Sequence, residues 1–208
     1  MKKFNYVMLV TMFLGVAGSV SAQQVDSFDD VSLWNASYPA NLYYQGNASQ
    51  AHEGTGSMVV DYTPMIGDGI YMNRDLPASM DFSAAAAAGG WVSIMMHVEE
   101  AGDHAAITAL KMTTSYYHSE YQWDAAWGAT YDAGWNELII PLADFNMTAS
   151  SSITPDWGNI NRIELITGAY PDGSPTDLFV DNWQVVVPEP ATMALLGLGG
   201  LMLRRRKA

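Results

Sequence analysis

The segment from Trp91 to Val98 alternates between two faces, and this alternation limits the fold more than any other feature of the sequence. One face carries only apolar side chains, those of Val92, Ile94, Met96 and Val98. The opposite face carries Trp91, Ser93, Met95 and His97. A period of two is the spacing of a β-strand that packs one face on a core, whereas a helix repeats about every 3.6 residues. The segment therefore predicts a half-buried β-strand.

Short runs of the same kind recur along the chain, separated by glycine, aspartate, asparagine and proline. We expect strands at residues 25–28, 42–45, 57–62, 69–74, 91–98, 105–113, 119–124, 135–141, 160–167 and 177–187. An alanine run at 84–88 ends at Gly89-Gly90, which predicts a loop or a helix stub. Many short strands without a long amphipathic helix are typical of an all-β, antiparallel β-sandwich.

The N-terminus has the three parts of a secretory signal peptide. Lys2 and Lys3 form a basic start, residues 7–16 form an apolar segment, and Val20-Ser21-Ala22 supplies small residues at a cleavage site. Cleavage after Ala22 is predicted, which would leave Gln23 as the first residue of the mature protein. We therefore assign residues 1–22 to a cleavable signal helix and exclude them from the fold.

The C-terminus also has three parts, which we take together as residues 188–208. Pro188-Glu189-Pro190 stops any regular element, because each proline fixes φ and lacks an N–H donor. An apolar segment follows at 191–203, and the chain then carries Arg204-Arg205-Arg206-Lys207. As a helix, the apolar segment would be about 20 Å long, short of the roughly 30 Å hydrocarbon core of a bilayer. We expect a short apolar helix that anchors the chain only temporarily.

Pro-Glu-Pro, a short glycine- and leucine-rich apolar segment and a terminal arginine cluster resemble the PEP-CTERM sorting signal of Gram-negative bacteria. The residues that carry the resemblance are Pro188, Glu189, Pro190, Arg204, Arg205 and Arg206. The resemblance implies export, transient anchoring in the inner membrane and removal of the tail by an exosortase-type transpeptidase. It also implies a final place at the cell surface or outside the cell, among extracellular polysaccharide and biofilm. The alternative is an ordinary tail anchor after a proline-rich linker.

Removing both ends leaves a single domain at residues 23–187 that is strongly acidic. With 3 basic and 21 acidic side chains, its formal charge is near −18. Such a surface repels phosphate and argues against nucleic acid as a partner, although acidity also serves solubility alone. The chain has no cysteine, which excludes disulfides and thiolate metal sites.

The C-terminal half of this body resembles jelly-roll carbohydrate-binding modules. Residues 134–145 follow a W-x-x-x-x-I-P-L-x-D-F pattern, and 160–165 and 178–183 resemble the last two strands of such modules. Upstream, Phe28-Asp29 and the glycine turn at 52–58 occupy the positions of an acidic first strand and its following turn. The resemblance implies a galactose-binding-like jelly roll that binds polysaccharide.

That resemblance also implies one structural calcium, held by Asp29, Glu53 (or the carbonyls of 54–56) and Asp181. Calcium prefers six to eight oxygen ligands from carboxylates and carbonyls. Asp181 is informative, because strict alternation places it on the face of Phe179 and Trp183, where a lone carboxylate is costly. The alternative is that Asp181 accepts backbone hydrogen bonds from a neighbouring loop.

The aromatic residues suggest where a sugar would bind, since sugars stack on aromatic rings beside polar groups. Tyr121 and Trp123 share one face of their strand, with rings about 7 Å apart, and Trp127 follows them closely. If this face is open, it forms a sugar platform with Trp91 and His97 on the same sheet; if it faces inward, Tyr121 and Trp123 belong to the core. Three further tryptophans are expected in the core: Trp34, Trp135 and Trp183.

No pattern in the chain indicates catalysis. Glu120 and Asp124 could be taken as a carboxylate pair for glycoside hydrolysis, but acidic residues are so frequent that some such pair is always present. The four histidines show no metal-ligand spacing, and no catalytic triad or phosphate loop is found. We predict a non-catalytic polysaccharide-binding module. The alternatives are a calcium-dependent structural matrix protein without a specific glycan, and a polysaccharide hydrolase or lyase.

Overall fold

The computed structural model describes residues 21–36, 42–45, 51–61, 70–99, 106–115, 119–125, 131–148, 153–168 and 177–188, except for the side chains of 42–45 and 115. Within these ranges, no helix has the length and apolar character needed to cross a membrane. Residues 1–20 of the predicted signal helix, the apolar helix at 191–203, Trp127, Glu189, Pro190 and the arginines at 204–206 lie outside the described residues. Ser21 and Ala22, which were also expected in the signal helix, instead belong to a strand.

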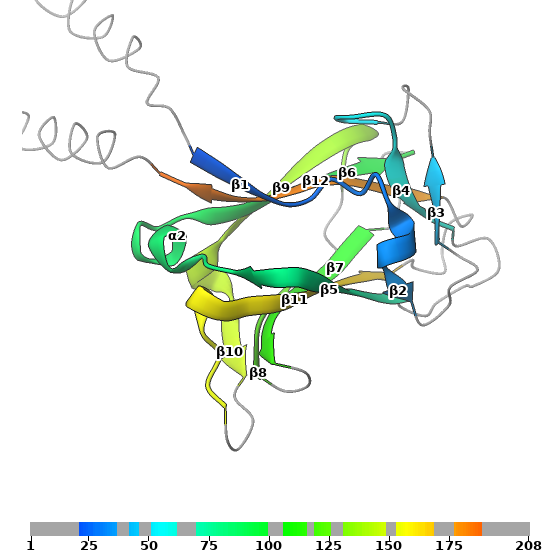
Figure 1. The fold of residues 1–208 in the computed structure, drawn as a ribbon. Coiled ribbons are helices and arrows are strands. Elements are labelled where there is room, and N and C mark those ends of the chain that lie inside the picture. Colours follow the sequence, from blue (N-terminus) through cyan, green and yellow to red (C-terminus); the bar gives the residue numbers. More distant parts are fainter. Residues whose placement is uncertain are drawn as a thin grey trace, which may run out of the picture.

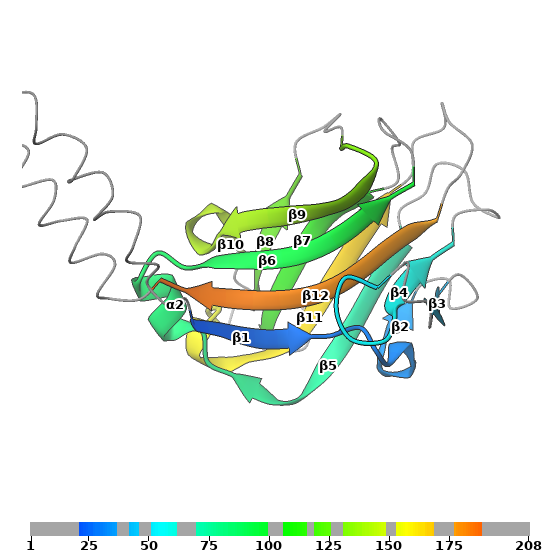
Figure 2. The same ribbon diagram turned by 90° about the horizontal axis from the view of Figure 1, so that it is seen from above.

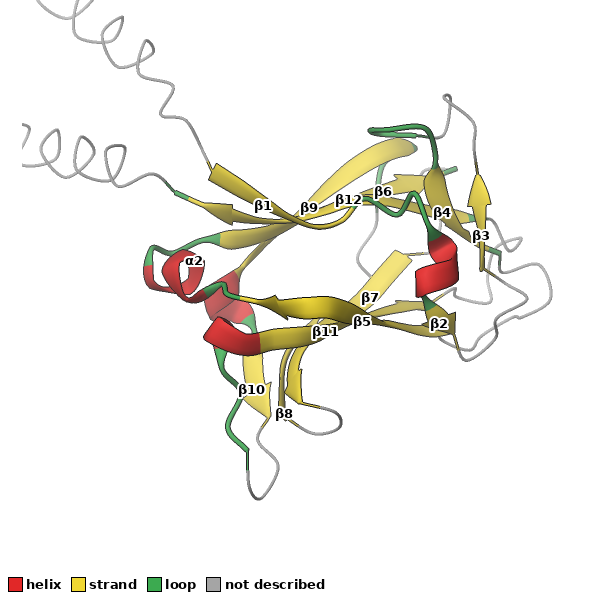
Figure 3. Ribbon diagram, in the orientation of Figure 1, coloured by secondary structure: helices red, strands yellow, loops and turns green. Residues whose placement is uncertain are grey.

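Two antiparallel sheets of six strands each lie face to face (Figures 1 and 3). Sheet A consists of β1 (Ser21–Asp26), β3 (Leu42–Gln45), β4 (Ser57–Val60), β6 (Trp91–Val98), β9 (Gly134–Pro141) and β12 (Leu178–Val187). Sheet B consists of β2 (Asn35–Ala36), β5 (Ile70–Met80), β7 (Ala106–Ser115), β8 (Ser119–Asp124), β10 (Asn146–Thr148) and β11 (Ile160–Gly168). The prediction of an all-β, antiparallel sandwich is confirmed.

Strand β12 lies in the middle of sheet A, and Figure 2 shows it between β6 and β1. One side of β12 pairs with β6 along most of its length. The other side is shared: β4 pairs with its first three residues, Leu178 to Val180, and β1 pairs with its end. In sheet B the order is β10-β8-β7-β11-β5-β2, so β11 and β7 are central.

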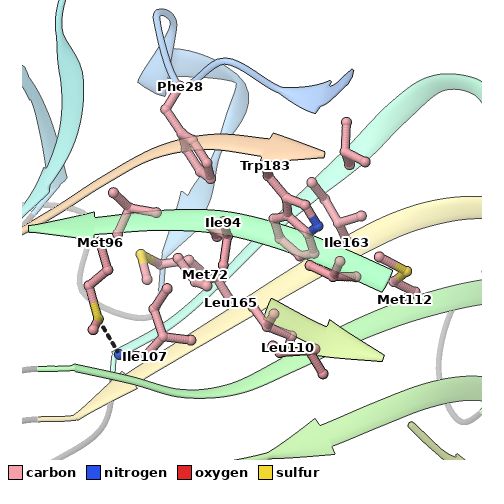
Figure 4. Close-up of a cluster of buried hydrophobic side chains, with 14 of the residues drawn as sticks. Phe28, Met72, Ile94, Met96, Ile107, Leu110, Met112, Ile163, Leu165 and Trp183 are labelled. Carbon is pink, nitrogen blue, oxygen red and sulfur yellow. Dashed lines mark hydrogen bonds between the residues drawn. The ribbon is translucent and has the colours of Figure 1, made fainter. Parts of the chain in front are cut away.

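The core fills the space between the two sheets and is built from the apolar faces of their strands. Figure 4 shows Ile94 of β6 pointing into the same interior as Leu165 of β11, while Met96 of β6 is directed at Ile107 of β7. The apolar face predicted for the segment 91–98 is confirmed, because Val92, Ile94, Met96 and Val98 are all fully or almost fully buried. The strand is not half-buried as expected, however, since Ser93 and Met95 on its other face are buried as well. Trp34 and Trp183 also lie in the core, as predicted.

Several element boundaries differ from the sequence-based expectation. The first strand begins at Ser21 rather than Val25, because its early residues pair with the end of β12. Strand β5 continues through Pro77 to Met80; the register with β11 is irregular there, so the missing N–H of Pro77 leaves the ladder intact. The alanine run forms the five-residue helix α2 (Ser83–Ala87), which confirms the predicted helix stub.

A β-bulge at Asn182 reverses the expected alternation of β12. Asn182 has a φ of 49°, and the register with β6 shifts between Asp181 and Gln184. Asp181 therefore shares the outer face of sheet A with Phe179, while Trp183 points into the core. The expectation that Asp181 lies on the face of Trp183 is wrong, because strict alternation does not anticipate a bulge.

Candidate functional site

The carboxylate of Asp181 is fully buried and holds a turn formed by residues 51–56. Its Oδ2 accepts hydrogen bonds from the backbone N–H groups of His52 and Glu53, at 2.8 and 2.9 Å. Its Oδ1 accepts a third from the N–H of Asn182, at 2.8 Å. Burial raises the pKa of Asp181 above its ordinary value, although these three hydrogen bonds oppose the rise. One of the two explanations for Asp181 was that it accepts backbone hydrogen bonds from a neighbouring loop, and these hydrogen bonds are present.

The other two predicted calcium ligands lie around the same turn. A Cβ at Gly54 would lie 3.0 Å from Oδ1 of Asp29, so this carboxylate packs directly against the turn. The Glu53 carboxylate instead accepts a hydrogen bond from Nε2 of Gln24, at 2.9 Å. The structure thus brings Asp29, Glu53 and Asp181 to one region.

These side chains do not form a ready calcium cage. Asp181 already uses three of the roughly four acceptor positions of a carboxylate. Among the residues that the structure describes, no three histidine, aspartate or glutamate side chains gather closely enough to hold a metal ion. Because Asp181 is largely occupied, a calcium ion here would depend on Asp29 and on Glu53 or the carbonyls of 54–56, which were the expected alternative to Glu53.

Tyr121 and Trp123 face the interior of the sandwich. Residues directly opposite each other in an antiparallel pair share a face, and Tyr121 pairs with Met112 while Trp123 pairs with Leu110. Both partners are fully buried, and both aromatic rings pack partly buried against the core. Tyr121 also stacks on Trp157 at 3.7 Å between ring centroids and donates its hydroxyl to the carbonyl of Pro155. Of the two orientations left open by the sequence, the inward one is observed.

Trp91 and His97 lie on the outer face of sheet A, so the expectation that they share one sheet with Tyr121 and Trp123 is wrong. The His97 ring makes edge contacts with Trp135 and Phe179, at centroid distances of 5.3 and 5.5 Å. Burial lowers the pKa of His97.

Trp135 is only partly buried and lies on this outer face rather than in the core, because it pairs with His97. The prediction that Trp135 is a core residue is therefore wrong.

Much of the outer face of sheet B is polar, and we call this part the polar face; the next row, beside Tyr71, is apolar, with Ile166 and Ala109. The polar face is formed by Tyr71, Asn73 and Asp75 of β5, Lys111 and Thr113 of β7, Glu120 and Gln122 of β8, and Arg162 and Glu164 of β11. The register places these side chains in two cross-strand rows, with Tyr71 beside them. One row runs Asn73, Glu164, Lys111, Gln122, and the other runs Asp75, Arg162, Thr113, Glu120. The consecutive strands β7 and β8 thus build one surface with β5 and β11, which are distant from each other in sequence.

Ion pairs fix the charged groups of the polar face. Lys111 donates to Glu120 at 2.9 Å, and both side chains are largely buried, at 20% and 14% exposure. Arg162 donates to Asp75 at 3.2 Å and to Glu164 at 3.1 Å. Burial alone would lower the pKa of Arg162, but the neighbouring carboxylates of Glu164 and Asp75 outweigh it and raise the pKa. The guanidinium of Arg162 is therefore held in its charged form, and the ion pairs hold these side chains in position.

Two further features of the polar face are typical of a ligand-binding surface. The hydroxyl of Thr113 is buried between Arg162 and Glu120 and has no hydrogen-bond partner, which is uncommon for a buried polar atom. Tyr71 is 57% exposed, one of the largest values among the exposed large hydrophobic residues of the described chain. An exposed ring next to fixed hydrogen-bonding groups is the combination that sugar recognition needs.

The polar face was not predicted from the sequence, although two of its parts left a signal there. The sequence predicted that Arg162 and Glu164 lie opposite Ile163 and Leu165, and this is confirmed. The alternation of Tyr71 and Asn73 with buried Met72 was a second available signal. The pairing of β11 with both β5 and β7, which joins these signals, could not be read from one sequence.

Comparison with known proteins gives one match to a family and several to solved structures. Residues 186–207 match the family described as the PEP-CTERM protein-sorting motif, which confirms the resemblance of the tail. No curated protein matches the chain.

The fold is similar to that of carbohydrate-binding modules from Clostridium thermocellum. The solution structure of CtCBM11 has a TM-score of 0.54 at 18% identity, over 83% of this chain and 99% of that one. A family 11 module solved in complex with a β-1,3-1,4-mixed-linked tetrasaccharide has a TM-score of 0.52 at 16% identity, over 81% and 97% of the two chains. The family 30 module of the cellulosomal cellulase Cel9D-Cel44B has a TM-score of 0.52 at 11% identity, over 81% and 99%. The chain thus combines the β-sandwich fold seen in carbohydrate-binding modules with a C-terminal PEP-CTERM sorting motif.

Proposed function

We propose that this protein is an exported, non-catalytic module that binds polysaccharide through the polar face of sheet B. The observation that carries the proposal is the set of ion-paired, partly buried donors and acceptors beside the exposed ring of Tyr71. The similarity of the fold to carbohydrate-binding modules supports it.

In this proposal Tyr71 supplies the flat apolar surface on which a sugar ring stacks. Arg162 and Lys111 donate hydrogen bonds to sugar hydroxyls, while Glu164 and Gln122 are placed to accept them. Because ion pairs already fix the charged side chains, little side-chain entropy remains to be lost on binding.

The charges favour a neutral sugar polymer over an acidic one. Only three basic residues lie between 23 and 187, and each contacts a carboxylate: Arg74 with Asp26, Lys111 with Glu120, and Arg162 with Asp75 and Glu164. No positive charge is left uncompensated to attract a polyuronate, and the acidic body as a whole repels it.

The sorting motif supports a place of action outside the cytoplasm. We propose that an exosortase-type transpeptidase removes the tail after transient anchoring in the inner membrane of a Gram-negative bacterium. The domain would then act at the cell surface or in extracellular polysaccharide and biofilm.

A second proposal is a structural role with one calcium and no specific glycan. It is supported by the position of Asp29 and Asp181 against the same turn. Calcium and glycan binding are separate properties and can be tested separately.

Affinity electrophoresis of the mature domain in gels containing neutral or acidic polysaccharides tests the binding proposal. We expect retardation by at least one neutral polymer, such as a mixed-linkage β-glucan, and none by alginate or polygalacturonate. Retardation by acidic polymers alone would overturn the choice of ligand. A reducing-end assay on the retained polymers tests for catalysis, and we expect no release of reducing ends.

A further inference from the structure

The end of β12 is part of the sorting motif and is also paired within the fold. The matched motif begins at Val186, whereas β12 continues to Val187. Val186 pairs with Trp91 of β6 on one side and with Ala22 of β1 on the other. It is 7% exposed. Gly90 packs so closely here that a Cβ on it would collide with the Val186 carbonyl oxygen. The sorting motif therefore starts inside the folded domain, without a spacer.

The partners of these motif residues come from the predicted signal peptide. Ser21 pairs with Val187 and Ala22 with Val186, and both precede the predicted cleavage point after Ala22. Val187 pairs with Ser21 and has no partner on β6 among the paired residues that the structure describes. Figures 1 and 2 show that the start of β1 and the end of β12 lie together at the α2 end of the sandwich.

We propose that signal-peptide cleavage releases the end of β12 and so exposes the sorting motif for tail removal. Cleavage after Ala22 shortens β1 to residues 23–26 and removes its two pairs with the motif. In an antiparallel ladder, hydrogen-bonded and non-hydrogen-bonded pairs alternate, so losing two successive pairs removes one doubly hydrogen-bonded pair. Val187 then has no strand neighbour, and Val186 keeps only Trp91. The tail gains a short extended linker before Pro188, and the two processing steps follow a fixed order.

Hydrogen–deuterium exchange on three purified chains tests this proposal: residues 1–208, 21–208 and 23–208. All three keep the sorting motif, and the second differs from the third only by Ser21 and Ala22. Because neighbouring N–H groups of a strand point to opposite sides, only one of the amides of Val186 and Val187 faces β1. We expect that amide to exchange about fivefold faster in 23–208, the factor expected from losing one backbone hydrogen bond. The amides of 178–180, which pair with β4, serve as an internal control and should exchange equally in all three.

Equal exchange of Val186 and Val187 in the three chains would overturn the proposal. Faster exchange throughout β12 of the 23–208 chain would overturn it as well, because it would show general destabilisation rather than release of one strand end. The experiment involves no sugar, so its outcome is independent of the glycan-binding proposal.

Discussion

A buried ion pair between Asp26 and Arg74 connects the two sheets, and its removal should be strongly destabilising. Asp26 lies on β1 of sheet A and Arg74 on β5 of sheet B, with side chains only 2% and 16% exposed. The Asp26 carboxylate also accepts hydrogen bonds from the backbone N–H of Phe28 at 2.7 Å and from Nε1 of Trp34 at 3.1 Å. Asp26→Ala therefore leaves three donors without an acceptor, one of them a buried guanidinium.

Removing one partner of a buried ion pair costs about 3–5 kcal/mol. For a domain of this size, about 1 kcal/mol lowers the melting temperature by roughly 2–4 °C, so we expect a decrease of about 6–20 °C. Arg74→Met should cost a comparable amount, because it leaves a buried carboxylate. Urea unfolding of the mature domain, followed by far-UV circular dichroism, measures both.

The double variant Asp26→Leu/Arg74→Met separates the ion pair from local packing. Two apolar side chains of similar volume can replace a buried pair at little cost, so the double variant should be less destabilised than the sum of the single variants Asp26→Leu and Arg74→Met by about 1–3 kcal/mol. Strictly additive losses would show that Asp26 and Arg74 stabilise the fold independently, and would refute a bridge between the sheets.

Three further predictions concern the turn at 51–56 and the outer face of sheet A. If the protein binds calcium and the free calcium concentration is about 100 times Kd, EDTA should lower the melting temperature by about 5–11 °C, and excess calcium should restore it. An unchanged melting temperature would end the calcium proposal. Folding raises the pKa of Asp181 above its ordinary value of 3.8, so the stabilising contribution of this group is fully present below pH 3.8 and declines as pH rises through the folded pKa. The difference in unfolding free energy between wild type and Asp181→Asn should therefore narrow as pH rises above 3.8, and a widening difference would contradict this. Folding lowers the pKa of His97 below 6.5, so the free energy of unfolding should decrease as pH falls below that value. His97→Phe should lessen this decrease. If the free energy of unfolding depended on pH equally in both proteins, His97 would not be responsible.

The fold could be predicted because its main signal is local. Alternation in the segment 91–98 and in β11 depends only on neighbouring residues, and the structure confirms both. The bulge at Asn182 could not be predicted in this way, because one residue with positive φ reverses every later position of the strand.

The candidate site depends on strand pairing, which a single sequence does not reveal. Tyr121 and Trp123 were correctly placed on one face, but only the pairing with Leu110 and Met112 shows that this face points inward. The polar face combines β5 with β11, whose residues are separated by about ninety positions, and sequence spacing alone does not bring them together.

The central claim is that the polar face of sheet B binds a neutral glycan, and a pair of matched aromatic variants tests it most directly. Tyr71→Ala removes the exposed ring from the polar face, whereas Trp91→Ala removes a partly exposed ring from the outer face of sheet A. Isothermal titration of each variant with the neutral polymer that retards the wild-type domain measures the effect.

We predict that Tyr71→Ala weakens binding about tenfold or more, equivalent to about 1.4 kcal/mol, while Trp91→Ala binds as tightly as wild type. Both variants should keep the far-UV circular dichroism spectrum of the folded domain. Unchanged affinity in Tyr71→Ala would contradict binding at the polar face. A loss of affinity confined to Trp91→Ala would also contradict it and would place the glycan on the outer face of sheet A.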